Sequence, residues 1–213
     1  MEYNPKMLAA KAKLLERFKQ MEPRQADRAQ QRLPPGQHLT TGFPVLDLGV
    51  RPKFHEPRWR FEVKGEVERE LSLTWEQLQQ LPRVEQVSDF HCVTTWSKFD
   101  VAWGGVRFVD VAALVQPTAK ARFVIAEGSD YYTTNIPLDD CLHEDVILAD
   151  ELFGEPLPRQ HGGPMRLIVP HLYAWKSAKF LRRLKFSPVD ELGYWEERGY
   201  HRRGDPWKEE RHG

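Results

Sequence analysis

The sequence predicts a mixed α+β fold that is rich in β-strands and forms a single domain with an N-terminal helical appendage. Segments with the apolar patterns of strands outnumber segments with helical spacing. The two kinds do not alternate regularly, as they would in a doubly wound parallel sheet. The 213 residues are enough for one sizeable core, and no internal repeat or low-complexity linker divides them.

Three parts are expected along the chain. Residues 1–42 form a helical appendage and an extended arm, because apolar residues recur at three- and four-residue spacing over residues 5–21, with Lys and Glu on the other side. Residues 43–190 form the main domain, and residues 191–213 a C-terminal tail packed on it. The apolar run 42–49, which glycine closes, predicts either an edge strand or a loop laid over a site.

Strands are expected where apolar residues alternate or run together between turn residues. These segments are residues 59–65, 70–73, 84–93, 122–126, 145–149 and 165–169, with a last core segment at 180–186. Helices are expected at residues 75–81, where Thr74 and Gln77 fit a capping box, and at residues 108–115. Gly104 and Gly105 are expected to form a turn.

Charge and composition exclude several classes of protein. Basic and acidic residues both number 31, so a general nucleic-acid binder, which carries a basic excess, is not expected. Two cysteines are too few for a disulfide scaffold or a four-thiolate metal site. No run of about 18 apolar residues predicts a membrane span. Because the N-terminal residues form neither a secretory apolar segment nor a twin-arginine motif, we expect a cytoplasmic protein.

Cys92 ends an apolar, strand-like run, and its thiol has three possible roles. It could be a packed core residue, which is the usual case, a nucleophile, or a ligand to a soft metal. In an extended chain adjacent side chains point to opposite faces, so His91 cannot readily serve as its base. As a metal ligand, a single cysteine would be one donor among several, which indicates a metal carried by an organic cofactor.

A second group of polar residues lies in residues 161–166 and 176–179. Arg166, Lys176 and Lys179, together with Ser177, would form a local anion pocket, because guanidinium and ammonium groups make charge-assisted hydrogen bonds to phosphate. Gly162 and Gly163 would let the backbone approach a bound group closely. A solvated basic face is the alternative reading of this spacing.

Four further residues with polar or thiol groups are read separately. Asp130 either pairs with a polar heterocycle or forms a turn. Cys141, in a short helix expected at residues 138–142, is read as structural. His143 and His171 have no metal-ligand spacing to a partner, so a zinc site made by protein side chains alone is not expected.

Taken together, several blocks of sequence resemble the molybdopterin-binding domain of the sulfite oxidase family. The blocks are residues 90–97, 103–106, 132–138 and 161–170, with 176–179. Their order and spacing carry the resemblance, which spans roughly residues 43–188. Within the family, the chain looks most similar to stand-alone bacterial and archaeal members and to the catalytic subunit of the periplasmic methionine sulfoxide reductase.

This resemblance implies the fold of that domain and a molybdenum held by the dithiolene of one molybdopterin and by Cys92. Further positions match family contacts to the pterin and its phosphate. These residues are His161, Arg166, Ser177, Ala178, Lys179 and Asp130, with Leu46 and Asp47 on a segment that lies along the cofactor. Residues 43–190 are thus the expected molybdopterin-binding domain.

The implied function is a molybdopterin-dependent oxidoreductase that carries out two-electron, oxygen-atom-transfer chemistry on a small substrate with an unidentified electron-transfer partner. Thr94, Trp96 and Trp103 would shape the substrate side. Sulfite itself is not expected, because residues 93–98 lack the arginine that helps sulfite oxidases hold that anion. The alternatives are a thiol enzyme with Cys92 as nucleophile and a distant base such as His161, or a non-catalytic protein that docks a partner through residues 5–21.

Overall fold

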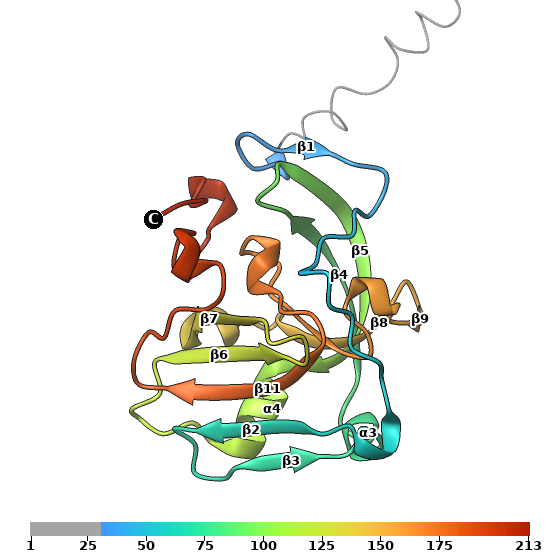
Figure 1. Ribbon diagram of the computed structural model, residues 1–213, viewed down its shortest axis with the longest axis vertical. Coiled ribbons are helices and arrows are strands. Elements are labelled where there is room, and N and C mark those ends of the chain that lie inside the picture. The colour runs from blue at the N-terminus through green and yellow to red at the C-terminus, as the bar shows by residue number, and fades with distance from the viewer. Residues whose placement is uncertain (1–30) are drawn as a thin grey trace, which may run out of the picture. The chain divides into compact units, whose positions relative to one another are not determined.

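The computed structural model describes residues 31–213, so the helix predicted over residues 5–21 lies outside the described residues. Residues Pro34–Gly213 form a compact unit built on two β-sheets (Figure 1). Both sheets are mixed, and most of their strand pairs are antiparallel. The helices are few and short, so the α+β prediction is confirmed. The division of the chain at residues 43 and 190 stays a prediction.

The first sheet carries the strands on either side of Cys92. Its main path runs β1 (His38–Leu39), β5 (Trp96–Arg107), β8 (Ile147–Leu152) and β10 (Arg166–Ile168). β4 (Val84–His91) also pairs with β5, and β9 (Glu155–Pro156) pairs with β8. Short β1 adds to β5 in parallel, so residues 38–39 of the expected arm belong to the sheet.

The second sheet has five strands in the order β3 (Leu71–Leu73), β2 (Phe61–Gly65), β11 (Leu181–Ser187), β6 (Phe123–Gly128) and β7 (Thr133–Pro137). β11 pairs with β2 in parallel and with β6 in antiparallel fashion. The last predicted core segment, residues 180–186, therefore corresponds to the central strand of this sheet. Residues 161–179, which come just before it in the chain, lie beside both sheets (Figure 1).

The helices form where the sequence predicts them. α3 (Trp75–Gln79) begins with the predicted capping box, in which Thr74 and Gln77 exchange side-chain and backbone hydrogen bonds. α4 (Phe108–Val115) buries Phe108, Val111 and Val115 along one face. α5 (Leu138–Cys141) is a single turn with Cys141 fully buried. None of the helices within residues 31–213 is long and apolar enough to cross a bilayer.

The turn predicted at Gly104 and Gly105 is wrong. Both glycines lie inside β5, a strand of 12 residues, at a shift in register against β8. A Cβ atom on Gly105 would come within 2.1 Å of the carbonyl oxygen of Leu148. The glycine is therefore needed because two strands come close together at this position. From the sequence alone, this role cannot be distinguished from that of a glycine in a turn.

Candidate functional site

Cys92 lies in a tight turn that joins β4 to β5. The Thr95 N–H donates to the Cys92 carbonyl (3.0 Å), and the Cys92 N–H donates to the Trp96 carbonyl (2.8 Å). From outside the turn, the Gln37 side-chain amide donates to the Cys92 carbonyl (3.1 Å), and Arg211 donates to the Val93 carbonyl. Segments near residues 37 and 211 thus brace the turn from the two ends of the compact unit.

The thiol of Cys92 is nearly hidden, with the residue 6% exposed. Its Sγ lies 3.1 Å from the Thr94 hydroxyl oxygen. Burial raises the pKa of this thiol, although Thr94 and the charges of Arg211 and Lys179 oppose the rise. His91 is directed elsewhere: its Nδ1 lies 2.8 Å from the Ser97 hydroxyl, in agreement with the prediction that it is not the base for Cys92.

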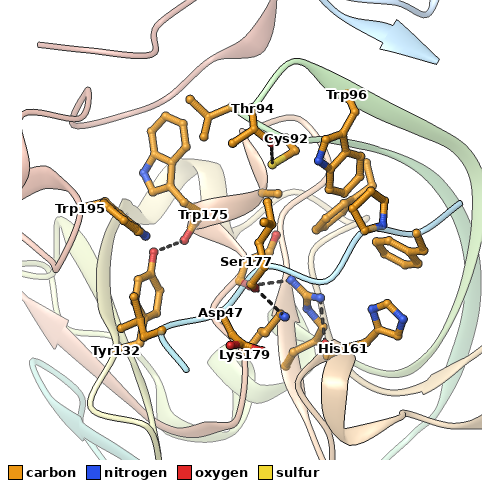
Figure 2. A pocket seen from close by; sticks show the side chains of 18 of the residues that line it. Asp47, Cys92, Thr94, Trp96, Tyr132, His161, Trp175, Ser177, Lys179 and Trp195 are labelled. Atoms are coloured by element: carbon orange, nitrogen blue, oxygen red, sulfur yellow. Dashed lines mark hydrogen bonds between the residues drawn. The ribbon is translucent and has the colours of Figure 1, made fainter. Parts of the chain in front are cut away.

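A cavity of about 360 Å³ opens at Cys92 and brings most of the predicted site residues together. Cys92 and Thr94 lie at one end, and Asp47 and Lys179 at the other, with Ser177 between them (Figure 2). Eight of the nine predicted site residues line it: Leu46, Asp47, Cys92, Asp130, His161, Arg166, Ser177 and Lys179. The exception, Ala178, is buried beside it and accepts a hydrogen bond from the Leu167 N–H through its carbonyl (3.0 Å).

Arg166 is the most informative residue of the cavity wall. It is only 3% exposed, and no carboxylate among the described residues forms an ion pair with it. Its guanidinium donates to the carbonyls of His161 and Ser177 (both 2.9 Å), while its buried Nε has no hydrogen-bond partner within residues 31–213. Burial lowers the pKa of Arg166, but a guanidinium stays charged in proteins. The guanidinium also lies over the rings of Phe90 (5.1 Å) and Trp103 (5.6 Å), and a buried cation with only carbonyl and aromatic partners suits the binding of an anion.

Lys179 adds a second positive charge at the same end of the cavity. Its Nζ donates to the carbonyls of Leu46 (2.7 Å) and Gln160 (2.9 Å), which fixes the loop of residues 42–49 over the cavity. That loop has no regular structure, so the second of the two predictions for it is confirmed. Burial first, and then the charge of Arg166, lower the pKa of Lys179 to about 8.

The remaining polar residues contribute little net charge. Burial lowers the pKa of His161 to about 4, with Arg166 and Lys179 adding to the effect, so the imidazole is neutral near pH 7 and stacks on Phe43 (4.5 Å between ring centroids). Asp47 is matched by Arg51 at 2.7 Å. Burial raises the pKa of Asp130, whose carboxylate accepts from the Tyr132 N–H. The cavity therefore keeps a surplus of positive charge.

Lys176 does not belong to the anion pocket in which the sequence placed it. It is fully buried and donates to Glu196 Oε1 (2.6 Å), to the Asn135 carbonyl (2.7 Å) and side chain, and to the Arg202 carbonyl. The Trp175 indole also donates to Glu196 Oε1 (2.9 Å). Lys176 thus fastens the C-terminal tail to β7 and does not line the cavity.

The two glycines of residues 161–166 also differ from expectation. A Cβ atom on Gly162, which has φ of +107°, would meet the Lys179 side chain at 2.8 Å. On Gly163 it would come within 2.1 Å of the Leu157 carbonyl oxygen. They allow close packing of the protein on itself, and Gly162 lets the Lys179 stem pass beneath the cavity wall.

Aromatic side chains that sequence reasoning missed form one wall of the cavity. Trp175, Trp195 and Tyr200 line it together with Tyr132, whose hydroxyl donates to the Trp175 carbonyl (Figure 2). Trp195 and Tyr200 come from the tail and stack on each other, with ring centroids 4.9 Å apart. The density of aromatic residues after residue 193 was the available signal. Trp103, expected on the substrate side, is buried behind the wall.

A cavity with a thiol at one end, and at the other two cations that form no ion pair among the described residues, is of the kind that binds an elongated anionic cofactor. The orphaned Nε of Arg166 and the thiol donor of Cys92 both fit a metal-bearing pterin phosphate.

Comparison with known proteins identifies the family. Residues 48–195 match the family described as the oxidoreductase molybdopterin binding domain, so the chain belongs to this family. The chain is 44% identical to the uncharacterized oxidoreductase YuiH of Bacillus subtilis strain 168 over 189 residues, 88% of this chain and 95% of YuiH. The resemblance to the sulfite oxidase family is confirmed, and the protein is a molybdenum cofactor-dependent oxidoreductase that uses Mo-molybdopterin.

More distant relatives are longer than this chain. It is 28% identical to the methionine sulfoxide reductase catalytic subunit MsrP of Campylobacter jejuni over 166 residues, 70% of this chain and 56% of MsrP. The sulfane dehydrogenase SoxCD of Paracoccus pantotrophus superposes with a TM-score of 0.62 at 21% identity, covering 74% of this chain and 46% of that one. The likeness to SoxCD bears on the fold alone and agrees with the predicted fold type.

Proposed function

We propose that this protein catalyses two-electron, oxygen-atom-transfer chemistry on a small substrate at a molybdenum that Cys92 ligates. The observation that carries the proposal is the position of Cys92 in the same cavity as Arg166, whose buried guanidinium has no carboxylate partner among the described residues. When bound, the molybdenum supplies the two-electron redox chemistry.

In this proposal, different residues of the cavity bind different parts of the cofactor. Arg166 and Lys179 bind the phosphate through charge-assisted hydrogen bonds, for which the Nε of Arg166 is unoccupied by other described residues. His161 and Asp130 offer hydrogen-bonding groups to the pterin ring system, and Ser177 and Ala178 shape the wall between the two ends. Leu46 and Asp47 lie on the covering loop that Lys179 holds in place.

Around Cys92, the chain orients the sulfur and limits access of water. The turn that Gln37 and Arg211 brace holds the thiol toward the cavity, and Thr94 lies within hydrogen-bonding distance of Sγ. Trp96 and the aromatic wall keep the surroundings apolar. Among the described residues, residues 93–98 contribute no arginine to the cavity and Arg211 is occupied by the Val93 carbonyl, so the site suits a neutral oxide better than the sulfite anion.

A sulfoxide or an N-oxide is therefore the proposed substrate class. The chemistry named for MsrP, reduction of a methionine sulfoxide, belongs to the same class.

The two alternatives receive less support. A nucleophilic thiol needs a lowered pKa or an adjacent base, whereas burial raises the pKa of Cys92 and its side-chain contact is the hydroxyl of Thr94. A purely docking role would depend on residues 5–21, and it would leave a cavity with buried cations unexplained.

The test compares Cys92→Ser with Cys141→Ala after production in a host that makes molybdopterin. Cys141 is the matched control because it is also buried but lies outside the cavity. We expect about one molybdenum and one pterin per chain in the wild type and in Cys141→Ala. With a reduced dye as electron donor, both should reduce sulfoxides or N-oxides, and Cys92→Ser should not. Wild-type metal content and activity in Cys92→Ser would refute the proposal.

A further inference from the structure

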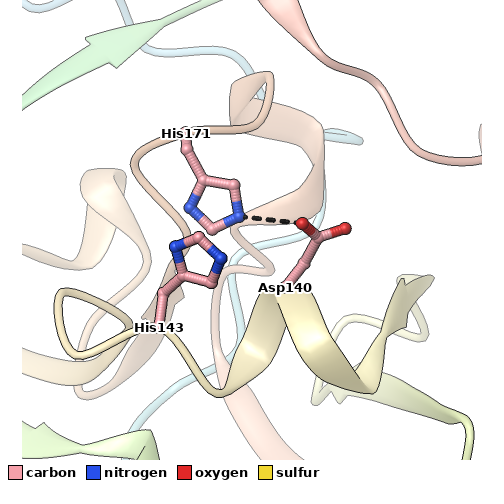
Figure 3. A group of neighbouring side chains, drawn as sticks. All are labelled: Asp140, His143 and His171. Carbon is pink, nitrogen blue, oxygen red and sulfur yellow. Dashed lines mark hydrogen bonds and ion pairs between the residues drawn. The ribbon is translucent and has the colours of Figure 1, made fainter.

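Three side chains that are scattered in the sequence meet on a face of the protein away from the cofactor cavity. Asp140 belongs to α5, His143 to the turn that follows it, and His171 to the segment after β10 (Figure 3). None of them lines the cavity. The sequence spacing indicated no metal site here, because the third member comes from a distant segment that the fold brings alongside α5.

The geometry of the three side chains suits a small cation. The imidazoles of His143 and His171 stack almost in parallel, with centroids 4.3 Å apart and planes 23° from each other. His171 Nε2 lies 3.2 Å from Asp140 Oδ1, and one ligand atom from each residue lies within 4.8 Å of the others. Ligand atoms around a tetrahedral zinc, with bonds of about 2.0–2.1 Å, are about 3.3 Å apart.

Two of the ligand positions are therefore already at the required separation. The third, His143, is exposed, and its ligand nitrogen lies within 4.8 Å of the other two ligand atoms, so a side-chain rotation can complete the site. The imidazole of His171 has one hydrogen bond among residues 31–213, to Asp140, and its Nδ1 is buried without a partner among the same residues. The ring can thus tilt toward a cation at Nε2 without breaking a second hydrogen bond.

Arg203 sets the charge and orientation of the carboxylate. Its guanidinium donates to both oxygens of Asp140, each at 2.9 Å. This two-point ion pair holds the carboxylate in a fixed orientation, as the carboxylate of a metal site needs to be held, while the charge of Arg203 limits the affinity for a cation.

We propose that Asp140, His143 and His171 form a binding site for a divalent cation of the zinc class, with water completing its coordination. Two imidazoles and one carboxylate are the donors that zinc and its neighbours in the transition series take. The cation takes the place of the hydrogen bond between His171 Nε2 and Asp140 Oδ1, and the single N–H of the neutral imidazole is then carried by Nδ1.

Such a cation would tie together segments that build the cofactor cavity. His171 precedes the residues 174–179 of the cavity wall, and Arg203 belongs to the tail that contributes Trp195 and Tyr200. Occupancy would stabilise the folded chain, because a ligand that binds only the native state adds to its stability. This site is independent of the redox chemistry proposed for Cys92.

The experiment titrates the purified, molybdenum-loaded full chain with Zn²⁺ by calorimetry and repeats the titration with Co²⁺, whose visible absorption reports coordination by nitrogen and oxygen. We expect one Zn²⁺ per chain, an affinity at least tenfold weaker in His143→Ala and His171→Ala, and a rise in melting temperature on addition of Zn²⁺ that both variants lose. His55→Ala is the matched control, because His55 is an exposed histidine away from the cluster and should keep full binding.

Cys92→Ser separates this site from the cofactor thiol and must also retain binding. His143 is exposed, so His143→Ala decides the outcome even where His171→Ala fails to fold. Weak, non-saturating binding, binding that His143→Ala leaves unchanged, or binding lost in Cys92→Ser would each overturn the proposal.

Discussion

Replacement of Arg166 by methionine should have opposite effects on the two forms of the protein. In the cofactor-free form Arg166 is a buried charge without a carboxylate partner among the described residues. Removing a buried charge that has no ion-pair partner recovers its desolvation cost, which is on the order of several kcal/mol. The change also forfeits two charge-assisted hydrogen bonds to the carbonyls of His161 and Ser177, worth about 1.5–3 kcal/mol each. The two effects nearly cancel, so we expect cofactor-free stability to change by less than about 2 kcal/mol.

In the cofactor-bound form the same change removes the buried partner of the phosphate. Breaking a buried charge pair on one side costs about 3–5 kcal/mol, which corresponds to roughly a hundred-fold to several-thousand-fold weaker retention of the cofactor. The assay measures molybdenum and pterin per chain after exhaustive desalting, and urea denaturation of cofactor-free protein. Arg182→Met is the matched control, because Arg182 is exposed on β11 and outside the cavity.

The two measurements separate a binding role from a structural one. Full molybdenum and pterin content in Arg166→Met would show that Arg166 is not the anion partner. A loss of more than about 4 kcal/mol in the cofactor-free protein would show instead that its hydrogen bonds to carbonyls hold the fold together. An intermediate retention in Arg166→Lys would support the fork-like geometry of the guanidinium as well as its charge.

Three further predictions follow from the charges and the thiol of the site. Lys176→Met leaves Glu196 buried and unpaired, so urea denaturation should show a loss of about 3–5 kcal/mol; a loss below 1 kcal/mol would contradict the buried pair. The pKa of Lys179 is about 8 in the folded, cofactor-free protein and about 10.4 unfolded, so between these values the unfolded chain binds the extra proton. The stability of the wild type relative to that of Lys179→Met should therefore rise from pH 8 to pH 10, because the titrations of Cys92 and Cys141 are common to both proteins; a difference that stays constant with pH would refute the assignment. Cys92 in cofactor-free protein should react with iodoacetamide more slowly than free cysteine at pH 8, because burial raises its pKa; faster labelling would favour the thiol-enzyme hypothesis.

Most of the secondary structure could be predicted from local patterns in the sequence. The capping box at Thr74 and the apolar spacing of residues 108–115 each act within a few residues, and both helices form as predicted. The turn predicted at Gly104 and Gly105 was wrong because a glycine can be required wherever another part of the chain comes close to its backbone. At Gly105 the group that comes close is the Leu148 carbonyl, from a strand more than 40 residues away.

The candidate site follows the same division. The chemical types of Cys92, Arg166 and Lys179 were readable because a thiolate ligand and a phosphate partner are properties of single side chains. The direction of Lys176 was not, since neighbouring residues of one short turn face opposite ways and only the packing of Glu196 from the tail decided that Lys176 leaves the cavity.

From the sequence alone, this protein was determined to have an α+β fold, a cysteine suited to a soft metal and a family that binds molybdopterin. The tertiary structure alone decided which cations remain unpaired, that the tail supplies Trp195 and Tyr200 to the cavity, and that His143 and His171 meet beside Asp140. The physical reason is that hydrogen bonds, charge pairs and metal geometry act over a few ångströms in space. Residues 28 or more positions apart reach that range only when the two sheets have formed.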